Sequence, residues 1–264
     1  FPNFTSIAFS QKVVVSEYFN YPGATAQLEW TEILVLEDNI SLVGWSVHDY
    51  SGDLSARVNG PVFKDIPLWK HLRAGTIIVI DHRLTTPAQP TDSDPSDGYI
   101  QVMQLDADFF QGAGFGLDIG QPAEMVTIRD ADDNPVHSLA HLTSGLASSN
   151  LIWLNMPQPK VAHNTASQLQ TAYSVRVTGR SVQAYQSGFG SDSTSSGPVV
   201  IVAPPSDPGT GPSKGLPNLI DNDKRIAGRK NVNHWFWRET REPTWSAPPS
   251  VTASEVLAAK HTIS

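Results

Sequence analysis

The stretch LEWTEILVLEDNISLVGWSVHDYSGD, residues 28–53, decides the fold class. Its first run, Glu29–Leu36, is rich in Trp, Ile, Val and Thr, which favour strands, and the polar residues 37–39 supply a turn. In the second run, apolar residues at 43, 45 and 47 alternate with small or polar ones. A period of two predicts a strand with one buried face. Two strands and a turn of this kind indicate an all-β protein.

The apolar residues of these two runs form the predicted core: Trp30, Val43, Trp45 and Val47. The alternation places Val43, Trp45 and Val47 on one side of their strand. Trp45 is then expected to be almost fully buried between two sheets. Truncating it to Ala should cost about 3 to 5 kcal/mol because of the cavity left behind.

Three motifs in this part of the chain resemble landmarks of lamin-tail domains. Residues 30–33 (WTEI) match W-x-E-[LI], residues 42–45 (LVGW) match L-x-G-W, and residues 72–80 (LRAGTIIVI) match L-x-x-G-x-x-[VI]-x-[VI]. The resemblance covers roughly residues 12–190 and departs from the family at Asp133, where a turn usually carries Gly. It implies an immunoglobulin-like β-sandwich of lamin-tail type with a long insertion at about 144–170.

Other β-branched or aromatic runs bounded by turn residues predict further strands. They lie at residues 12–19, 62–66, 76–80, 99–105, 124–129, 135–141, 151–154, 173–177 and 182–185. We place the domain at residues 1–190. The Gly-, Ser- and Pro-rich residues 191–217 predict a linker with an added edge strand at 198–203. Residues 218–264 are expected to form a tail that docks on the domain or on a neighbouring subunit.

Composition limits the partners. The 264 residues carry a formal net charge of -8, so the molecule as a whole repels nucleic-acid phosphates and anionic membrane surfaces. The chain has no Cys, which removes disulfides, Cys-ligated zinc and thiol catalysis. The unbroken apolar runs, such as residues 77–80, are far shorter than the roughly 20 residues of a transmembrane helix. We therefore expect no nucleic acid partner and no membrane span.

The loop before the strand at 99–105 carries Asp92, Asp94 and Asp97, followed by Gly98. Carboxylates clustered on a turn are the oxygen ligands that calcium prefers, and Gly lets the backbone fold around an ion. The loop lacks the Glu that closes an EF-hand loop, and Pro95 restricts Asp94 to extended geometry. A calcium site and a solvated acidic loop both stay open as interpretations, and no other cofactor is expected.

No catalytic motif occurs in the context that it needs. His137 and His141 have the spacing of zinc ligands on a helix, but a strand would set them roughly 13 Å apart. Residues 211–215 (GPSKG) match G-x-S-x-G by letter, but prolines at 208 and 217 exclude the flanking strand and helix. The chain is not expected to be an enzyme. The alternative is a secreted hydrolase or a calcium-dependent carbohydrate or adhesion module.

The tail holds the candidate interface. Its anchors belong to residue types that dominate binding energies: Trp235, Phe236, Trp237, Arg238 and Trp245. The tail is also rich in basic residues, which suits single-stranded nucleic acid, but an acidic body is a better partner for it. A linker of about 14 residues could span roughly 40 Å. We expect the tail to reach another copy of the chain, which builds a filament or sheet when the contact does not close.

The resemblance to lamin-tail domains implies a non-catalytic structural or binding module, such as the repeating subunit of a surface assembly or filament. It also implies an extracellular or cell-surface location, bacterial rather than eukaryotic, because the family occurs more often in bacterial surface and secreted proteins. The chain begins at Phe1 without Met, which fits removal of a secretory signal and equally fits a cloned fragment.

Overall fold

The computed structural model describes residues 12–20, 29–50, 52–82, 91–112, 116–120, 123–158, 160–165, 173–177 and 199–202. Three of the predicted features therefore lie outside the described residues: the strand at 182–185, the linker apart from 199–202, and the whole tail with its anchors Trp235, Phe236, Trp237, Arg238 and Trp245.

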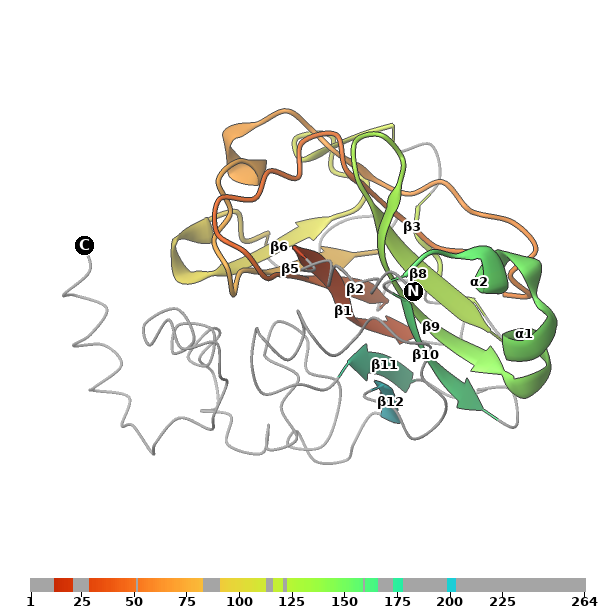
Figure 1. Cartoon of the computed structure of the whole chain (residues 1–264). Helices are drawn as coiled ribbons and strands as arrows, with labels where there is room; N and C mark the ends of the chain where they lie inside the picture. Colours follow the sequence, from red (N-terminus) through yellow and green to blue (C-terminus); the bar gives the residue numbers. More distant parts are fainter. Residues whose placement is uncertain are drawn as a thin grey trace, which may run out of the picture.

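Two six-stranded sheets make up the described part of the chain (Figure 1). The first has the order β12-β11-β1-β2-β5-β6 and consists of β1 (Val13–Asn20), β2 (Trp30–Val35), β5 (Ile77–Asp81), β6 (Tyr99–Met103), β11 (Tyr173–Val177) and β12 (Val199–Val202). The second has the order β10-β9-β8-β3-β4-β7 and consists of β3 (Ser46–His48), β4 (Val62–Phe63), β7 (Phe110–Gln111), β8 (Glu124–Arg129), β9 (Pro135–Thr143) and β10 (Lys160–Thr165). The chain is all-β, as predicted.

Both sheets are mixed. Neighbouring strands are antiparallel except for β5 with β6 in the first sheet and β9 with β10 in the second. A parallel pair needs a long crossover between its strands. Residues 144–159 provide the crossover for β9 and β10, and they include the two short helices α1 (Ser144–Ser149) and α2 (Leu151–Asn155). The predicted insertion at 144–170 therefore contains a strand of the second sheet as well as a surface elaboration.

The core lies where β1 of the first sheet packs against β8 and β9 of the second. Trp30 and Val47 are buried in it, as predicted. Trp69 lies in a 3-10 helix (Pro67–Trp69) and is fully buried, with its ring 4.9 Å from that of Phe63 and its Nε1 donating to the Phe109 carbonyl. The short helix thus fastens the loop before β5 to the second sheet.

The strand predicted around residues 43–47 forms only from Ser46 onward. β3 begins only at Ser46, while Val43 and Gly44 lie in a turn in which Gly44 has a φ of +77°. Val43 and Trp45 are partly buried and pack against the core from its edge. The prediction of an almost fully buried Trp45 is wrong, because the left-handed backbone at Gly44 interrupts the alternation on which it depended.

The predicted strand at residues 151–154 is also wrong, because these residues form helix α2. Asn150 caps the helix, since its side-chain oxygen accepts the N–H of Trp153 at 2.9 Å. At the other end, the Nζ of Lys160 donates to the carbonyls of Trp153 at 2.7 Å and Leu154 at 3.2 Å. The two caps override the strand propensity of the Leu-Ile-Trp run.

The remaining predicted strands in the described part are confirmed with shifted ends. The hairpin of β8 and β9 turns at 130–134, as predicted, and Asp133 has a φ of +64° there. The predicted edge strand at 198–203 is β12, which pairs with β11 at the edge of the first sheet. None of the described helices is long and apolar enough to cross a membrane.

Candidate functional site

Four carboxyl groups gather at the ends of several strands. Glu29 precedes β2, Asp49 follows β3, Glu124 begins β8, and Asp118 lies in the segment 116–120. We call Glu29, Asp49, Asp118 and Glu124 the carboxylate cluster. Its members come from distant parts of the chain, and three of them, Glu29, Asp49 and Glu124, are buried.

The three buried carboxylates bind the backbone of the 116–120 segment. The Asp49 carboxylate accepts the N–H of Asp118 at 2.7 Å, and the Glu29 carboxylate accepts that of Ile119 at 3.0 Å. The Glu124 carboxylate accepts the N–H of Gly120 at 2.6 Å. These side chains therefore accept backbone N–H groups that, in a sheet, would donate to a neighbouring strand.

Two glycines let the side chains approach this closely. A Cβ added at Gly116 would lie 2.3 Å from the amide nitrogen of Gln104. A Cβ added at Gly120 would lie 3.2 Å from a carboxylate oxygen of Glu124 and 3.0 Å from the Cα of Gly52. The GLDIG sequence of residues 116–120 thus provides space for the groups that hold it.

One histidine faces the cluster. The Nδ1 of His82 lies 3.6 Å from a carboxylate oxygen of Glu29, and its Nε2 lies 2.9 Å from the Thr31 hydroxyl. Among the described residues, neither His82 Nδ1 nor the second carboxylate oxygen of Asp49 has a hydrogen-bond partner, although both atoms are buried.

Burial changes the acidity of the cluster. It raises the pKa of Asp49 from 3.8 to about 6. Burial, followed by the nearby charge of Asp49, raises the pKa of Glu124 well above its ordinary value. The pKa of Asp118 is also raised, by partial burial and then by the charge of Glu29. Burial therefore favours the protonated form of both Asp49 and Glu124.

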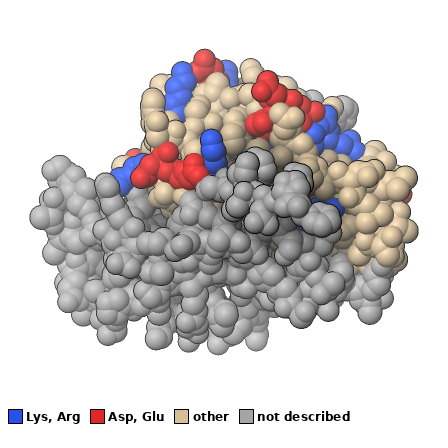
Figure 2. Space-filling view, viewed as in Figure 1, with Lys and Arg blue, Asp and Glu red and all other residues tan. Residues whose placement is uncertain are grey.

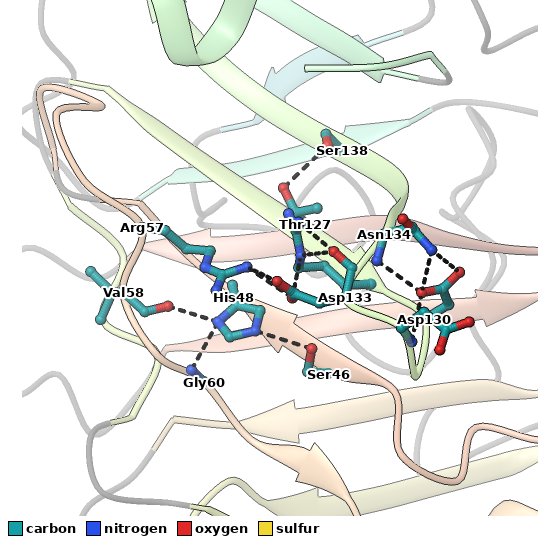
Figure 3. A network of polar contacts seen from close by, with 12 residues as sticks. Ser46, His48, Arg57, Val58, Gly60, Thr127, Asp130, Asp133, Asn134 and Ser138 are labelled. Carbon is teal, nitrogen blue, oxygen red and sulfur yellow. Dashed lines mark hydrogen bonds and ion pairs between the residues drawn. The ribbon is translucent and has the colours of Figure 1, made fainter. Parts of the chain in front are cut away.

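A second polar network lies at the tip of the β8–β9 hairpin (Figure 3). The Asp133 carboxylate lies 2.8 Å from Arg57 Nη1 and 2.7 Å from Arg129 Nε. Hydrogen bonds from Arg57, followed by those from Arg129, hold the pKa of Asp133 below its ordinary value. The Asp130 carboxylate closes the turn by accepting the N–H of Asn134 at 2.8 Å. This network ties residue 57 to the hairpin.

Ser46 and His48 lie beside this network on the outer face of β3, where Figure 3 shows the imidazole between Ser46 and residues 58–60. His48 Nε2 is 3.0 Å from the Ser46 hydroxyl, and Nδ1 is 2.9 Å from the Val58 carbonyl and 3.2 Å from the Gly60 N–H. Burial lowers the pKa of His48. Nδ1 thus fastens the loop at 58–60 to β3, while Nε2 contacts a residue of the same strand.

His137 and His141 lie on β9, as predicted, and both reach across to β1. Nδ1 of His137 accepts the N–H of Val15 at 3.2 Å, and Nδ1 of His141 lies 2.9 Å from the Tyr18 hydroxyl. Burial lowers the pKa of His137 to about 3, so its imidazole is neutral at physiological pH. The two histidines contribute polar contacts between the sheets.

The predicted calcium ligands Asp92 and Asp94 lie in an exposed turn. The Asp92 carboxylate accepts the N–H of Asp94 at 3.2 Å, and the Asp94 carboxylate accepts the N–H of Ser96 at 2.9 Å. The side chain of Asp97 lies outside what the structure describes. Within the described ranges, no group of three or more His, Asp or Glu side chains is placed to hold a metal ion.

A patch without charge lies over α1 and α2. The two exposed large hydrophobic residues of the described chain, Leu151 and Leu154, are 70% and 45% exposed on α2. No Asp, Glu, Lys or Arg occurs from residue 134 to residue 159. The surface beside these helices, to the right in Figure 2, is largely free of charged side chains. We call Leu151 and Leu154 with their surroundings on α2 the α2 patch.

Sequence reasoning missed both the carboxylate cluster and the α2 patch. One signal for the cluster was present, because Asp49 stands two residues after the buried Val47 and so continues the buried phase of the strand. Nothing in the sequence shows that Glu29 and Glu124 meet there. A scan against family models and a search of curated proteins each found no match to this chain.

Proposed function

We propose that this chain is a non-catalytic β-sandwich module of lamin-tail type that binds other copies of itself outside the cell or at the cell surface. The observation that carries the proposal is the α2 patch, where Leu151 and Leu154 are exposed while the other large apolar residues of the described part are buried or partly buried. Exposed apolar surface of this kind marks interaction sites.

The patch is built as a rigid surface. Asn150 caps the start of α2, and Lys160 binds the carbonyls at its end, with its Nζ 4.6 Å from the centre of the Trp153 ring. Trp153, between Leu151 and Leu154 in the sequence of the helix, is buried. A fixed helix that presents two leucines suits a partner that supplies large apolar side chains.

The occupant that we propose is the C-terminal segment of a second copy. That segment contains Trp235, Phe236, Trp237 and Trp245, which match an uncharged apolar surface. β12 ends at Val202, which leaves more than 30 residues before the first of these aromatic residues. Such a length lets the segment reach a neighbouring molecule.

The buried carboxylates support a non-catalytic role. Glu29, Asp49 and Glu124 have the chemistry of general acids and bases, but each is bonded to a backbone N–H of the protein itself. A catalytic group has to reach the atom with which it exchanges a proton. In this fold these carboxylates hold the backbone of residues 118–120 in place.

Sedimentation velocity over a range of concentrations tests the proposal. We expect the full chain to self-associate, and we expect both the double variant Leu151→Ser/Leu154→Ser and a chain that lacks residues 218–264 to lose that association. Arg73→Ser, an exposed change away from the patch, is the control and should associate as the wild type does. A full chain that stays monomeric at high concentration contradicts self-assembly, and a shortened chain that associates normally excludes the tail as the connector.

A further inference from the structure

The backbone of residues 117–120 is held by side chains. Its four consecutive N–H groups are donated, in order, to Gln104, Asp49, Glu29 and Glu124. The carbonyls are bound in the same way, since Gln104 Nε2 donates to the Leu117 carbonyl at 3.2 Å and Asn20 Nδ2 donates to the Ile119 carbonyl at 2.8 Å. Whatever changes these side chains also changes the hold on the segment.

Two opposing effects act on the position of residues 116–120. Leu117 and Ile119 are buried in the main core, which favours the closed position. Asp49 and Glu124, two of the carboxylates that hold it, are buried, and each loses hydration when it is ionised. The closed position therefore depends on how much charge the cluster carries.

Two buried atoms show that this charge is poorly compensated. One oxygen of Asp49 and Nδ1 of His82 are buried without a hydrogen-bond partner in the described part of the chain. The groups that face Asp49 are His82 after β5, Asp118 in the segment and Glu124 on β8. Glu29, before β2, faces His82 and Asp118.

Two arginines lie near this part of the chain but do not bind the carboxylates of the cluster. Arg57 and Arg129 act on Tyr50, the residue after Asp49, but both are engaged with Asp133 at the hairpin tip. The nitrogens placed toward these acids are those of His82, beside Glu29, and of His141, which stands opposite Glu124 in the β8–β9 ladder and contacts the Tyr18 hydroxyl.

We propose that Asp49 and Glu124 share a proton, and that loss of this proton shifts the 116–120 segment toward an open position in which Leu117 and Ile119 leave the core. The free oxygen of Asp49 is the place for the proton, because the other oxygen accepts the Asp118 N–H. A protonated Asp49 keeps that hydrogen bond while the repulsion with Glu124 is removed. The fold thus contains a proton-controlled latch, made of Asp49, Glu124 and the 116–120 segment.

The direction of the pH effect follows from burial. Burial raises the pKa of Asp49 from 3.8 to about 6, so the closed form binds the proton more tightly than an open, solvated form. The stabilisation is fully present below pH 3.8 and is lost as the pH rises through about 6. The latch holds in mild acid and loosens toward neutral and alkaline pH.

Hydrogen exchange of the amides of residues 117–120 in the intact chain tests the latch. After correction for intrinsic exchange rates, we expect the opening equilibrium of these amides to rise about tenfold from pH 5 to pH 8 in the wild type. In Asp49→Asn, the amide keeps an acceptor for the Asp118 N–H and carries no charge. The rise should disappear in this variant, and its melting temperature should exceed that of the wild type by more at pH 8 than at pH 5.

Asp94→Asn is the matched control, because it changes an exposed Asp whose carboxylate also accepts one backbone N–H. Its opening equilibrium should rise with pH as in the wild type. Equal opening of the wild type at pH 5 and pH 8 overturns the proposal, as does a rise that persists in Asp49→Asn. If Asp49→Asn does not fold, Glu124→Gln is measured in its place and the same two outcomes apply.

Discussion

Two regions of this molecule use carboxylates to bind backbone N–H groups, and they differ in almost everything else. At the tip of the β8–β9 hairpin, Asp130 accepts N–H groups of the turn while Asp133 lies between Arg57 and Arg129. At the end of the sandwich, the carboxylate cluster accepts the N–H groups of residues 118–120. The carboxylates of the tip are exposed to water, and two arginines bind one of them, whereas Glu29, Asp49 and Glu124 of the cluster are buried.

The pKa values of the two regions move in opposite directions. Arg57 and Arg129 lower the pKa of Asp133, whereas burial raises the pKa of Asp49 and Glu124. In Asp49 and Glu124, hydrogen bonds from backbone N–H groups lower the pKa, but burial outweighs them. Solvent and counter-charge decide whether a carboxylate stabilises the fold at high pH or at low pH.

The largest effect is expected from Glu124→Ala. Glu124 accepts the N–H groups of Gly120, Tyr50 and Met125, and its removal leaves all three without this acceptor in a buried place. The free energy of unfolding should fall by about 3 kcal/mol or more. Urea unfolding at pH 5 measures this loss, and a loss below about 1 kcal/mol would show that the cluster does little to hold the 116–120 segment.

Gly116→Ala is expected to come next. Its Cβ would lie 2.3 Å from the side chain of Gln104, which must then move away from Leu117. We expect a loss of about 1 to 3 kcal/mol from this overpacking. Gly145→Ala, on α1 with no atom within 4 Å of its added Cβ, is the matched control and should not destabilise the protein. Equal stability of the two variants would mean that the close approach of Gln104 to Gly116 does not contribute to stability.

Asp133→Asn should destabilise the protein less than Glu124→Ala and Gly116→Ala. The stabilisation by Asp133 should also depend on pH in the direction opposite to that of the carboxylate cluster. The pKa of Asp133 is lowered, so its stabilisation is present above pH 3.8 and is lost as the pH falls through the lowered value. The side chain is 55% exposed, which limits the contribution to about 1 kcal/mol or less and makes it sensitive to salt. Thermal unfolding at pH 7 in low and high salt measures it. A loss that does not depend on salt would contradict an ion pair as its cause.

The smallest effect is expected from calcium. Asp92 and Asp94 already use their carboxylates on backbone N–H groups of their own loop, as the hairpin tip does. We therefore expect millimolar calcium to change the melting temperature by less than about 1 °C. A larger rise that Asp94→Ala abolishes would instead support the calcium site.

The sequence determined much of the strand content by itself. Runs such as residues 12–19 and 124–129 have β-branched residues and clear turn boundaries, so their local preference agrees with the final sheets. The turn at 130–134 was equally local, because Asp130 closes it with its own carboxylate. Where local chemistry and tertiary packing agree, a pattern in the sequence is enough.

The tertiary structure decided the rest, for reasons of distance along the chain. Trp45 was misplaced because a left-handed Gly44 one residue earlier re-aims the backbone, and the strand predicted at 151–154 became a helix under the caps of Asn150 and Lys160. The carboxylate cluster joins residues as far apart as Glu29 and Glu124. Charge and burial at such a place are properties of the assembled sheets, because only folding brings those carboxylates together and removes their water.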